Sequence, residues 1–193
     1  MANNPLDTTL LDKAIIFAVK AHSGTERRGK GFPYIVHPME AMEIVSTMTA
    51  DQELLAAAAL HDTVEDTDVT VDLIRNEFGD RVADLVAAES DKVVEGVSEE
   101  DSWKSRKQAG IDLLAKAPRD VKMVALGDKL SNMRAIARDY EIIGDKIWNL
   151  FHAKEKSDHE WRYRSLLEAF RSLEGTSAFK EFEYLVNKVF GEK

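Results

Sequence analysis

The sequence predicts an all-α fold, built as a single-domain helical bundle. Apolar side chains repeat at helical spacing along nearly the whole chain, convincing strand patterns are few, and glycine and proline separate the periodic segments. A chain of 193 residues can bury a substantial core within one domain. We therefore expect residues 1–193 to form one domain, with a core over about 7–175 and a last helix over about 177–190.

The first helix is expected over about residues 7–22, where apolar residues recur at helical spacing. Asp7 or Thr8 can serve as its N-cap. The segment that follows, GTERRGKGFPYIVHP, is rich in glycine and cations, and its prolines indicate a loop. A second helix near 38–48 would place Pro38 in its first turn, where the missing N–H has no helical partner to lose.

The third helix begins after Asp51, a favourable N-cap, and continues through the run ELLAAAALHD to end near Thr63. Two shorter helices, VDLIRNEF and DRVADLVAAES, lie on either side of Gly79, and the acidic stretch DKVVEGVSEED is expected to be a loop. Further helices are expected near 102–116, 119–137, 141–152, 159–173 and 177–190.

Composition narrows the functional classes. The chain has no apolar run of roughly 18 residues and no signal-peptide pattern, so we expect a cytoplasmic protein that does not enter the membrane. It contains no cysteine, which excludes disulfides, thiolate nucleophiles and zinc sites built on cysteine. The net charge of −9 argues against nucleic-acid binding but leaves room for a small anionic ligand in a locally cationic pocket.

An acidic cluster follows the apolar part of the third helix. If helical geometry persists there, His61, Asp62, Glu65 and Asp66 share one face, and their carboxylates repel one another unless a cation intervenes. Histidine with carboxylates suits a divalent ion such as Mn²⁺, Fe²⁺, Zn²⁺ or Co²⁺. The pair His61-Asp62 alone is explained as well by a packed histidine and a solvated acidic turn.

Two other residues favour the metal. His37 lies in the tight sequence PYIVHP. Asp128 lies in VKMVALGDKLSNMR, where the five preceding residues are mostly apolar, and a carboxylate on an otherwise buried helix needs a partner. Taken singly, His37 is explained by a hydrogen-bonded loop histidine and Asp128 by a buried salt bridge with Lys129 or Arg134. Taken together with His61-Asp62, the two residues predict one metal site.

At this point the motifs match a known family. The order His37, His61-Asp62, Asp128 resembles the HD phosphohydrolase superfamily. More narrowly, RRGKGFPYIVHP, HDTVEDT and GDKLSNMR resemble the hydrolase domain of RelA/SpoT-type proteins, and the closest type is the small stand-alone alarmone hydrolase. The resemblance covers about residues 10–170 and implies an all-helical HD-type fold.

The resemblance also implies roles for individual residues. It implies one Mn²⁺ per chain, with other divalent ions as options, and removal of the 3′-pyrophosphate from ppGpp or pppGpp in the stringent response. The implied metal ligands are His37, His61, Asp62 and Asp128, the implied catalytic acids are Glu65 and Asp66, and the implied substrate-binding residues are Arg27, Arg28, Lys129, Asn132 and Arg134.

Departures from the family pattern leave alternatives open. Gly127, Ser131 and Ala135 stand where relatives carry other residues, which concerns the base and sugar contacts rather than the metal site. The sequence leaves ppApp, the 2′-phosphate of NADPH and a nucleotide monophosphate as other substrates, and a non-catalytic binding module as another class. It also leaves open the roles of Glu65 and Asp66, the metal used in vivo, the cations of 27–30 and 104–107 that contact phosphate, and the oligomeric state, with a homodimer as one option.

Overall fold

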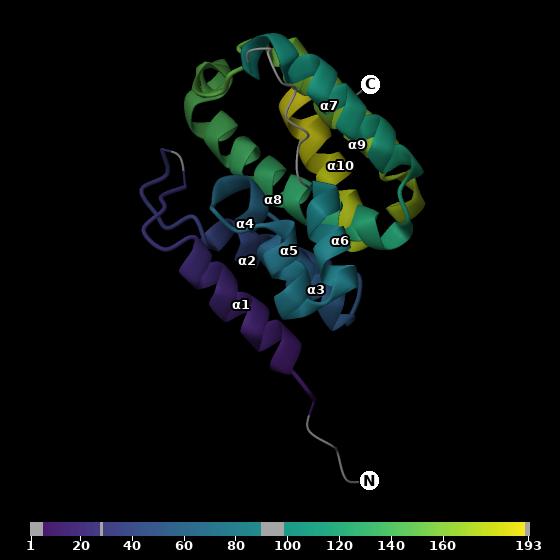
Figure 1. Ribbon diagram of the computed structural model, residues 1–193. Coiled ribbons are helices and arrows are strands. Elements are labelled where there is room, and N and C mark those ends of the chain that lie inside the picture. The colour runs from purple at the N-terminus through teal and green to yellow at the C-terminus, as the bar shows by residue number, and fades with distance from the viewer. Residues whose placement is uncertain (1–5, 28, 90–98, 192–193) are drawn as a thin grey trace.

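The computed structural model describes residues 6–27, 29–89 and 99–191, and these residues are predominantly helical (Figure 1). Their one β feature is an isolated bridge between Glu26 and Pro33, so the all-α prediction is confirmed. In chain order the helices are α1 Thr9–Ala21, α2 Val36–Ser46, α3 Gln52–Leu60, α4 Thr63–Asp66, α5 Val71–Phe78, α6 Asp80–Glu89, α7 Glu99–Lys116, α8 Arg119–Ile143, the 3₁₀ helix η1 Gly144–Leu150, α9 Lys156–Ala169, η2 Arg171–Leu173 and α10 Ser177–Phe190.

Helix α3 is the centre of the N-terminal part. Every residue from Leu54 to Leu60 is buried, because α1, α2, α6 and α8 all pack against this helix. The alanines in this run allow close approach of neighbouring helices, and the Asp51 carboxylate accepts a hydrogen bond from the Glu53 amide at 3.0 Å as the predicted N-cap. A helix buried on all sides is a rigid platform for the polar residues that follow it.

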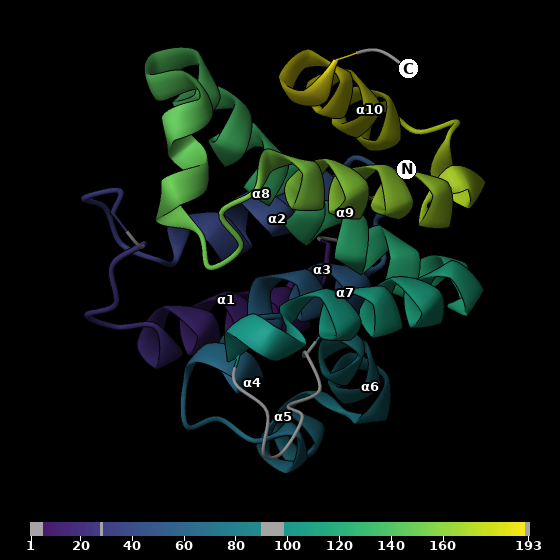
Figure 2. The ribbon, with the colours of Figure 1, turned by 90° about the horizontal axis from the view of Figure 1, so that it is seen from above.

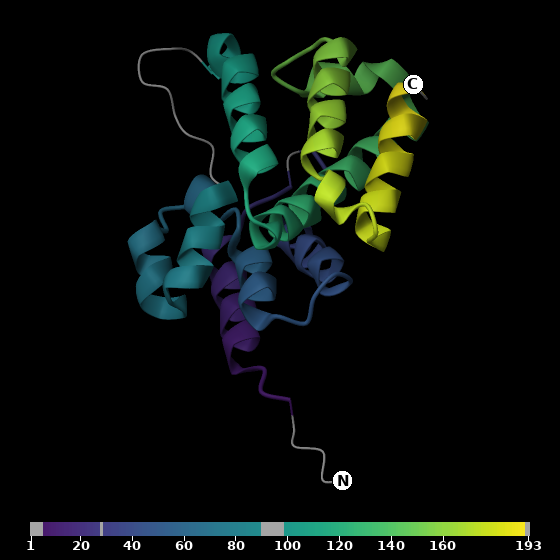
Figure 3. The same ribbon diagram turned by 90° about the vertical axis from the view of Figure 1, so that its right-hand side faces the viewer.

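Helix α8 joins this part to the C-terminal helices. It packs against α2, α3 and α6 on one side and against α10 and η1 on the other. Figure 2 shows α7, α9 and α10 in succession, with α7 beside α9 and α9 beside α10. In Figure 3 the helices before residue 90 form a lower tier and α7, α9 and α10 an upper one. One hydrophobic core runs through both tiers.

Helices α2 and α8 approach unusually closely at Gly127. A Cβ added to Gly127 would lie 2.7 Å from the carbonyl oxygen of Ala41 and 2.7 Å from Cγ2 of Val45, both on α2. Real Cβ atoms do not approach this closely, so only glycine fits here without displacing α2. This contact sets the distance between the two helices beside His37 and Asp128.

Two helix boundaries near the acidic cluster differ from the sequence prediction. Helix α2 starts at Val36 rather than 38, so that His37 lies on the helix and not in the loop. Helix α3 ends at Leu60, before the predicted end at Thr63, and a short helix α4 starts at Thr63. The Thr63 hydroxyl donates to the Leu60 carbonyl at 2.7 Å, which caps the break.

Later boundaries also differ. Helix α8 continues to Ile143 instead of 137 and ends at Gly144, whose φ of +57° favours glycine. The expected α-helix at 141–152 is therefore wrong, and the segment Gly144–Leu150 is a 3₁₀ helix. The helices predicted to start at 102 and 159 begin at Glu99 and Lys156, and the helix predicted at 177–190 is confirmed. Most of the expected loop at 91–101 lies outside the described residues.

Within the part of the chain that the structure describes, no helix combines the length and the hydropathy needed to cross a bilayer.

Candidate metal centre

Four side chains from three parts of the chain converge where α2, α3 and α8 pack together. His37 comes from α2, His61 and Asp62 from the break between α3 and α4, and Asp128 from α8. His37 Nε2 lies 3.1 Å from Asp128 Oδ1 and 3.3 Å from Asp62 Oδ2, while His61 Nε2 lies 3.0 Å from Asp62 Oδ2 and 3.7 Å from Asp128 Oδ1. The structure therefore brings the four predicted ligands together.

The ring of His61 presents a lone pair to this cluster. Its Nδ1 lies 2.8 Å from the Ala58 carbonyl oxygen, which can only accept, so Nδ1 carries the proton. Its Nε2 is buried and has no hydrogen bond to any residue that the structure describes. A buried nitrogen without a hydrogen bond, aimed at two carboxylates, fits a metal ligand whose other ring nitrogen is fixed by a carbonyl.

The ring of His37 is oriented in the same way through a longer chain. Ser131 donates its hydroxyl proton to Glu40 Oε2 at 2.7 Å, so its oxygen accepts from His37 Nδ1 at 2.8 Å. His37 Nε2 then also offers a lone pair. Because two lone pairs and two carboxylates face one another, the cluster needs a cation, and His37, His61 and Asp128 each offer an atom within 4.8 Å of the others.

The pKa values of the clustered histidine and carboxylate groups show how strongly these side chains interact. Burial acts to lower the pKa of His61, yet without a cation in the cluster the Asp62 and Asp128 carboxylates raise it well above its usual value, so a proton and a metal ion compete for the Nε2 lone pair. Burial acts to raise the pKa of Asp62, yet His61 and His37 lower it far below its usual range. Burial likewise acts to raise the pKa of Asp128, but Lys129 and the two histidines lower it well below its usual value. The carboxylates of Asp62 and Asp128 therefore stay ionised at neutral pH and can bind a cation.

Tyr34 contacts the candidate metal centre, although the sequence analysis gave it no role there. Its hydroxyl donates to Asp62 Oδ2 at 2.6 Å, and its ring lies over the buried ring of His22 with centroids 4.9 Å apart. Burial, followed by the Asp62 and Asp66 carboxylates, raises the pKa of Tyr34. Tyr34 lies two residues before α2, in a turn where the His37 amide donates to the Tyr34 carbonyl at 2.9 Å. Its spacing of three residues from His37 was the available sequence signal.

The two predicted catalytic acids lie on α4. Glu65 and Asp66 are exposed, unlike the buried ligands, and follow Asp62 by three and four residues. The Asp66 amide donates to the Asp62 carbonyl at 2.9 Å, so one turn of backbone links this acid to the cluster. The expected continuous helix is broken, but the turn of α4 still keeps both acids beside Asp62.

The structure brings Arg27 and Asn132 together although they are 105 residues apart. The guanidinium of Arg27 donates to Asn132 Oδ1 at 2.6 Å and lies 5.3 Å from the centre of the Tyr34 ring. Asn132 in turn donates to Asp128 Oδ1 at 2.5 Å. Asn132 is thus hydrogen-bonded directly to a candidate metal ligand, and Arg27 is connected to that ligand through Asn132.

The other predicted substrate-binding residues have different surroundings. Lys129 forms ion pairs with Asp128 and Glu89, and Arg134 donates to both carboxylate oxygens of Glu181 on α10 at 2.7 Å. A phosphate contact by Arg134 would require these hydrogen bonds to open. Arg28 lies outside the described residues.

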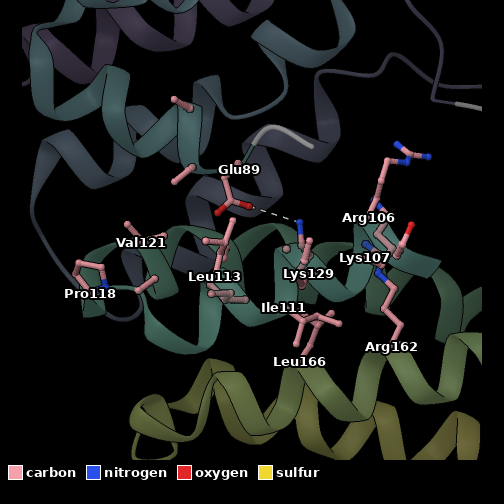
Figure 4. Close-up of a pocket in the computed structure, with 18 residues that line it drawn as sticks. Glu89, Arg106, Lys107, Ile111, Leu113, Pro118, Val121, Lys129, Arg162 and Leu166 are labelled. Carbon is pink, nitrogen blue, oxygen red and sulfur yellow. Dashed lines mark hydrogen bonds and ion pairs between the residues drawn. The ribbon is translucent and has the colours of Figure 1, made fainter. Parts of the chain in front are cut away.

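A cavity of about 570 Å³ lies beside the cluster, between α6, α7, α8 and α9. Figure 4 shows Arg106, Lys107, Arg162 and Lys129 toward one end and Val121 and Pro118 toward the other. Lys104 is not part of its lining; its ammonium pairs with Asp158 at 3.0 Å. Of the predicted cations at 104–107, the structure therefore directs Arg106 and Lys107 to the cavity.

Comparison with known proteins gives one family and a set of relatives. The family described as HD domain matches residues 14–155. A guanosine-3′,5′-bis(diphosphate) 3′-pyrophosphohydrolase of Aquifex aeolicus is 33% identical over 142 residues, which are 70% of this chain and 19% of that protein. A GTP pyrophosphokinase of Brucella ovis is 34% identical over 139 residues, which are 68% of this chain and 17% of that protein. The chain thus spans less than a fifth of these relatives' length.

Solved structures resemble the whole arrangement. A metazoan ortholog of SpoT that hydrolyses ppGpp superposes with a TM-score of 0.76 at 22% identity, over 99% of this chain and 100% of that one. A Listeria monocytogenes protein superposes with a TM-score of 0.70 at 28% identity, over 81% of this chain and 99% of that one. These likenesses agree with the helical architecture predicted from the sequence.

Proposed function

Because this chain belongs to the HD-domain family, we propose that it is a metal-dependent hydrolase that removes the 3′-pyrophosphate from ppGpp and pppGpp, giving GDP or GTP. One observation carries the proposal: two histidine lone pairs and two carboxylates converge in a cluster that requires a cation. The name of the Aquifex aeolicus relative supports the choice of substrate.

In this proposal His37, His61, Asp62 and Asp128 hold one Mn²⁺. A bound divalent ion screens phosphoryl charge and lowers the pKa of a coordinated water, which produces a nucleophile near neutral pH. The buried hydrogen bonds of the two histidines keep their Nε2 atoms directed at the cluster before the substrate arrives. Such preorganisation means that no ligand has to reorient during the reaction.

Glu65 and Asp66 are the proposed proton-transfer groups. Their exposure on α4 lets a substrate reach them, and the turn that joins them to Asp62 keeps them near the reacting phosphate. One of them takes the proton of the attacking water, and the other orients that water or protonates the leaving 3′-oxygen. Removing either acid separately shows which role it has.

Arg27 and Asn132 are the proposed contacts to the base and the ribose. The guanidinium of Arg27 is planar, so it can stack on a purine and also donate hydrogen bonds. Its present bond to Asn132 places both groups on the side of Asp128 that faces the loop before α2. A substrate that replaces this bond would therefore lie next to Asn132, which is hydrogen-bonded to Asp128.

The test is a substrate panel assayed with Mn²⁺: ppGpp, pppGpp, ppApp and NADPH. We expect release of pyrophosphate from ppGpp and pppGpp by the wild-type protein. Asp62→Ala should abolish this release, since a ligand is lost. Arg75→Ala is the control, because its ion pairs with Asp80 and Asp84 are largely exposed and concern α5 and α6.

Three results would contradict specific parts of the proposal. Release of inorganic phosphate alone, or faster turnover of NADPH, would exclude the alarmone substrate while keeping a metal-dependent hydrolase. Full activity in both Glu65→Ala and Asp66→Ala would exclude the proton-transfer assignment. Wild-type protein that binds Mn²⁺ yet hydrolyses none of the panel would leave the non-catalytic binding module as the better explanation.

A further inference from the structure

A buried ion-pair chain leads from a candidate metal ligand to the end of α6. The ammonium of Lys129 lies 3.5 Å from Glu89 Oε2 (Figure 4). The same ammonium forms an ion pair with Asp128 Oδ2. The side chains of Glu89, Asp128 and Lys129 are 5%, 8% and 19% exposed. Three ionised groups out of solvent interact far more strongly than the same groups at a surface.

We propose that Lys129 and Glu89 are positioning residues that orient the Asp128 carboxylate toward the metal. Lys129 binds Oδ2 of this carboxylate, and Glu89 fixes the ammonium of Lys129 from the other side. The proposal rests on the metal centre of the proposed function, but it concerns metal binding and does not depend on which nucleotide is hydrolysed.

The two oxygen atoms of Asp128 have separate partners. Oδ1 faces His37 Nε2 at 3.1 Å and accepts from Asn132 at 2.5 Å, whereas Oδ2 faces Lys129. With Oδ2 bound to the ammonium, Oδ1 is the atom that remains to bind a cation. The arrangement therefore favours a monodentate Asp128 and leaves more of the coordination sphere for water and substrate.

Glu89 is needed because Lys129 alone would hold the Asp128 carboxylate poorly in one orientation. A lysine side chain is long and flexible, and its charge repels a nearby cation. The Glu89 carboxylate offsets that charge and restricts the ammonium to one place. Burial raises the pKa of Glu89 while Lys129 acts to lower it, and the Asp128 and Glu89 carboxylates raise the pKa of Lys129 against the effect of burial.

A simple charge effect and a positioning effect predict opposite results for Lys129. If Lys129 acted only by its charge, replacing it with methionine would remove a repulsive cation and tighten Mn²⁺ binding. If Lys129 positions Asp128, the same replacement frees the carboxylate and weakens binding. The sequence prediction that Lys129 contacts phosphate concerns substrate, so measurements without substrate isolate the positioning role.

The experiment measures free Mn²⁺ by electron paramagnetic resonance during titration of the full chain without nucleotide. Support of a metal ligand by its outer partners is typically worth 10- to 100-fold in affinity, so Lys129→Met should bind Mn²⁺ about 10-fold to 100-fold more weakly than wild type. Glu89→Gln should lose about 10-fold or less, because Lys129 remains. Lys129→Arg should restore most of the affinity, since it keeps a cationic donor.

The matched control is Lys122→Met. Lys122 is also a buried lysine of α8, but its ammonium donates to the Ala115 carbonyl at 2.9 Å, in the direction of α7. The Lys122→Met variant should have a lower free energy of unfolding than wild type but the same Mn²⁺ affinity. Mn²⁺ binding by Lys129→Met that equals or exceeds the wild-type affinity would overturn the proposal.

A double variant guards against loss of folding. Lys129→Met leaves the buried Glu89 carboxylate without its partner, whereas Glu89→Gln with Lys129→Met removes both charges. The double variant should fold and bind Mn²⁺ as weakly as Lys129→Met. Recovery of wild-type Mn²⁺ affinity in the double variant would show that Lys129 and Glu89 only neutralise each other's charge and do not position Asp128. That result would also overturn the proposal. Absence of nucleotide hydrolysis would count against the proposed function only.

Discussion

Gly127 links helix packing to the metal centre at the scale of a single residue. The sequence marked it as a departure from the family pattern, and the structure gives the physical reason. Its missing side chain lets the backbone of α8 approach Ala41 and Val45 of α2, which lie about one and two turns after His37. The next residue is Asp128, so the same contact sets the spacing between two candidate ligands.

We predict that Gly127→Ala lowers the free energy of unfolding by about 1–3 kcal/mol, because the new Cβ forces α2 and α8 apart. Mn²⁺ affinity should fall as well, since His37 and Asp128 move apart. Urea denaturation and Mn²⁺ titration measure the two effects.

Gly110→Ala is the control for helix propensity. Gly110 lies on α7, and a Cβ added there meets no atom within 4 Å. This variant should gain about 0.5–1 kcal/mol, the usual benefit of alanine over glycine in a helix. A similar gain in Gly127→Ala would show that the close contact does not constrain the two helices.

At the scale of elements, the junction between η1 and α9 depends on an uncharged histidine. His159, near the start of α9, is stacked on Trp148 of η1 with ring centroids 4.9 Å apart and an interplanar angle of 26°. Its Nε2 donates to the Ala153 carbonyl at 2.9 Å. Burial lowers the pKa of His159, so the folded protein keeps this ring neutral where an unfolded chain would already protonate it.

This shift predicts a pH dependence of stability. Because the folded-state pKa of His159 lies below the unfolded value of about 6.5, the unfolded chain binds the proton first as the pH falls. The stabilising contribution is complete above that value and decreases as the pH falls through it toward the folded pKa. Denaturant unfolding at pH 7.5 and about 5.5 should therefore show a smaller difference in His159→Gln than in wild type.

His152→Gln is the control for that measurement. His152 lies in the linker between η1 and α9, but its side chain is exposed, so its replacement should leave the wild-type difference between the two pH values. An unchanged pH difference in His159→Gln would mean that other groups cause the acid sensitivity.

At the scale of the whole molecule, the candidate metal centre joins segments that are far apart in the chain. Its four candidate ligands come from α2, from the break after α3 and from α8, and α8 contacts both tiers of helices. An ion held by these ligands would cross-link the folded chain but not the unfolded one. Metal binding and folding are therefore coupled.

We predict that removing metal with a chelator lowers stability and that Mn²⁺ restores it. At a free Mn²⁺ concentration of 100 times the dissociation constant, linkage gives about 2.7 kcal/mol of additional stability. Thermal unfolding across a Mn²⁺ series measures this effect. Asp128→Ala should not respond to Mn²⁺, and an equal response in that variant would contradict the assignment of Asp128 as a ligand.

Much of the fold followed from local patterns in the sequence. Helical periodicity located most of the helices, Asp51 was recognised as a cap, and the last helix was placed at its observed bounds. The His61-Asp62 pair with His37 and Asp128 indicated a metal before any geometry was known. These signals succeed because periodicity and capping act between residues a few positions apart.

The remaining features depend on which helices pack together. The hydrogen bond from Tyr34 to Asp62, the bond from Arg27 to Asn132 and the ion pair of Lys129 with Glu89 join residues that are 28, 105 and 40 positions apart. No local pattern encodes such contacts, because they exist only once α2 and α6 are packed against α3 and α8. The sequence by itself determined the candidate metal ligands, and the tertiary structure decided which neighbours orient their side chains.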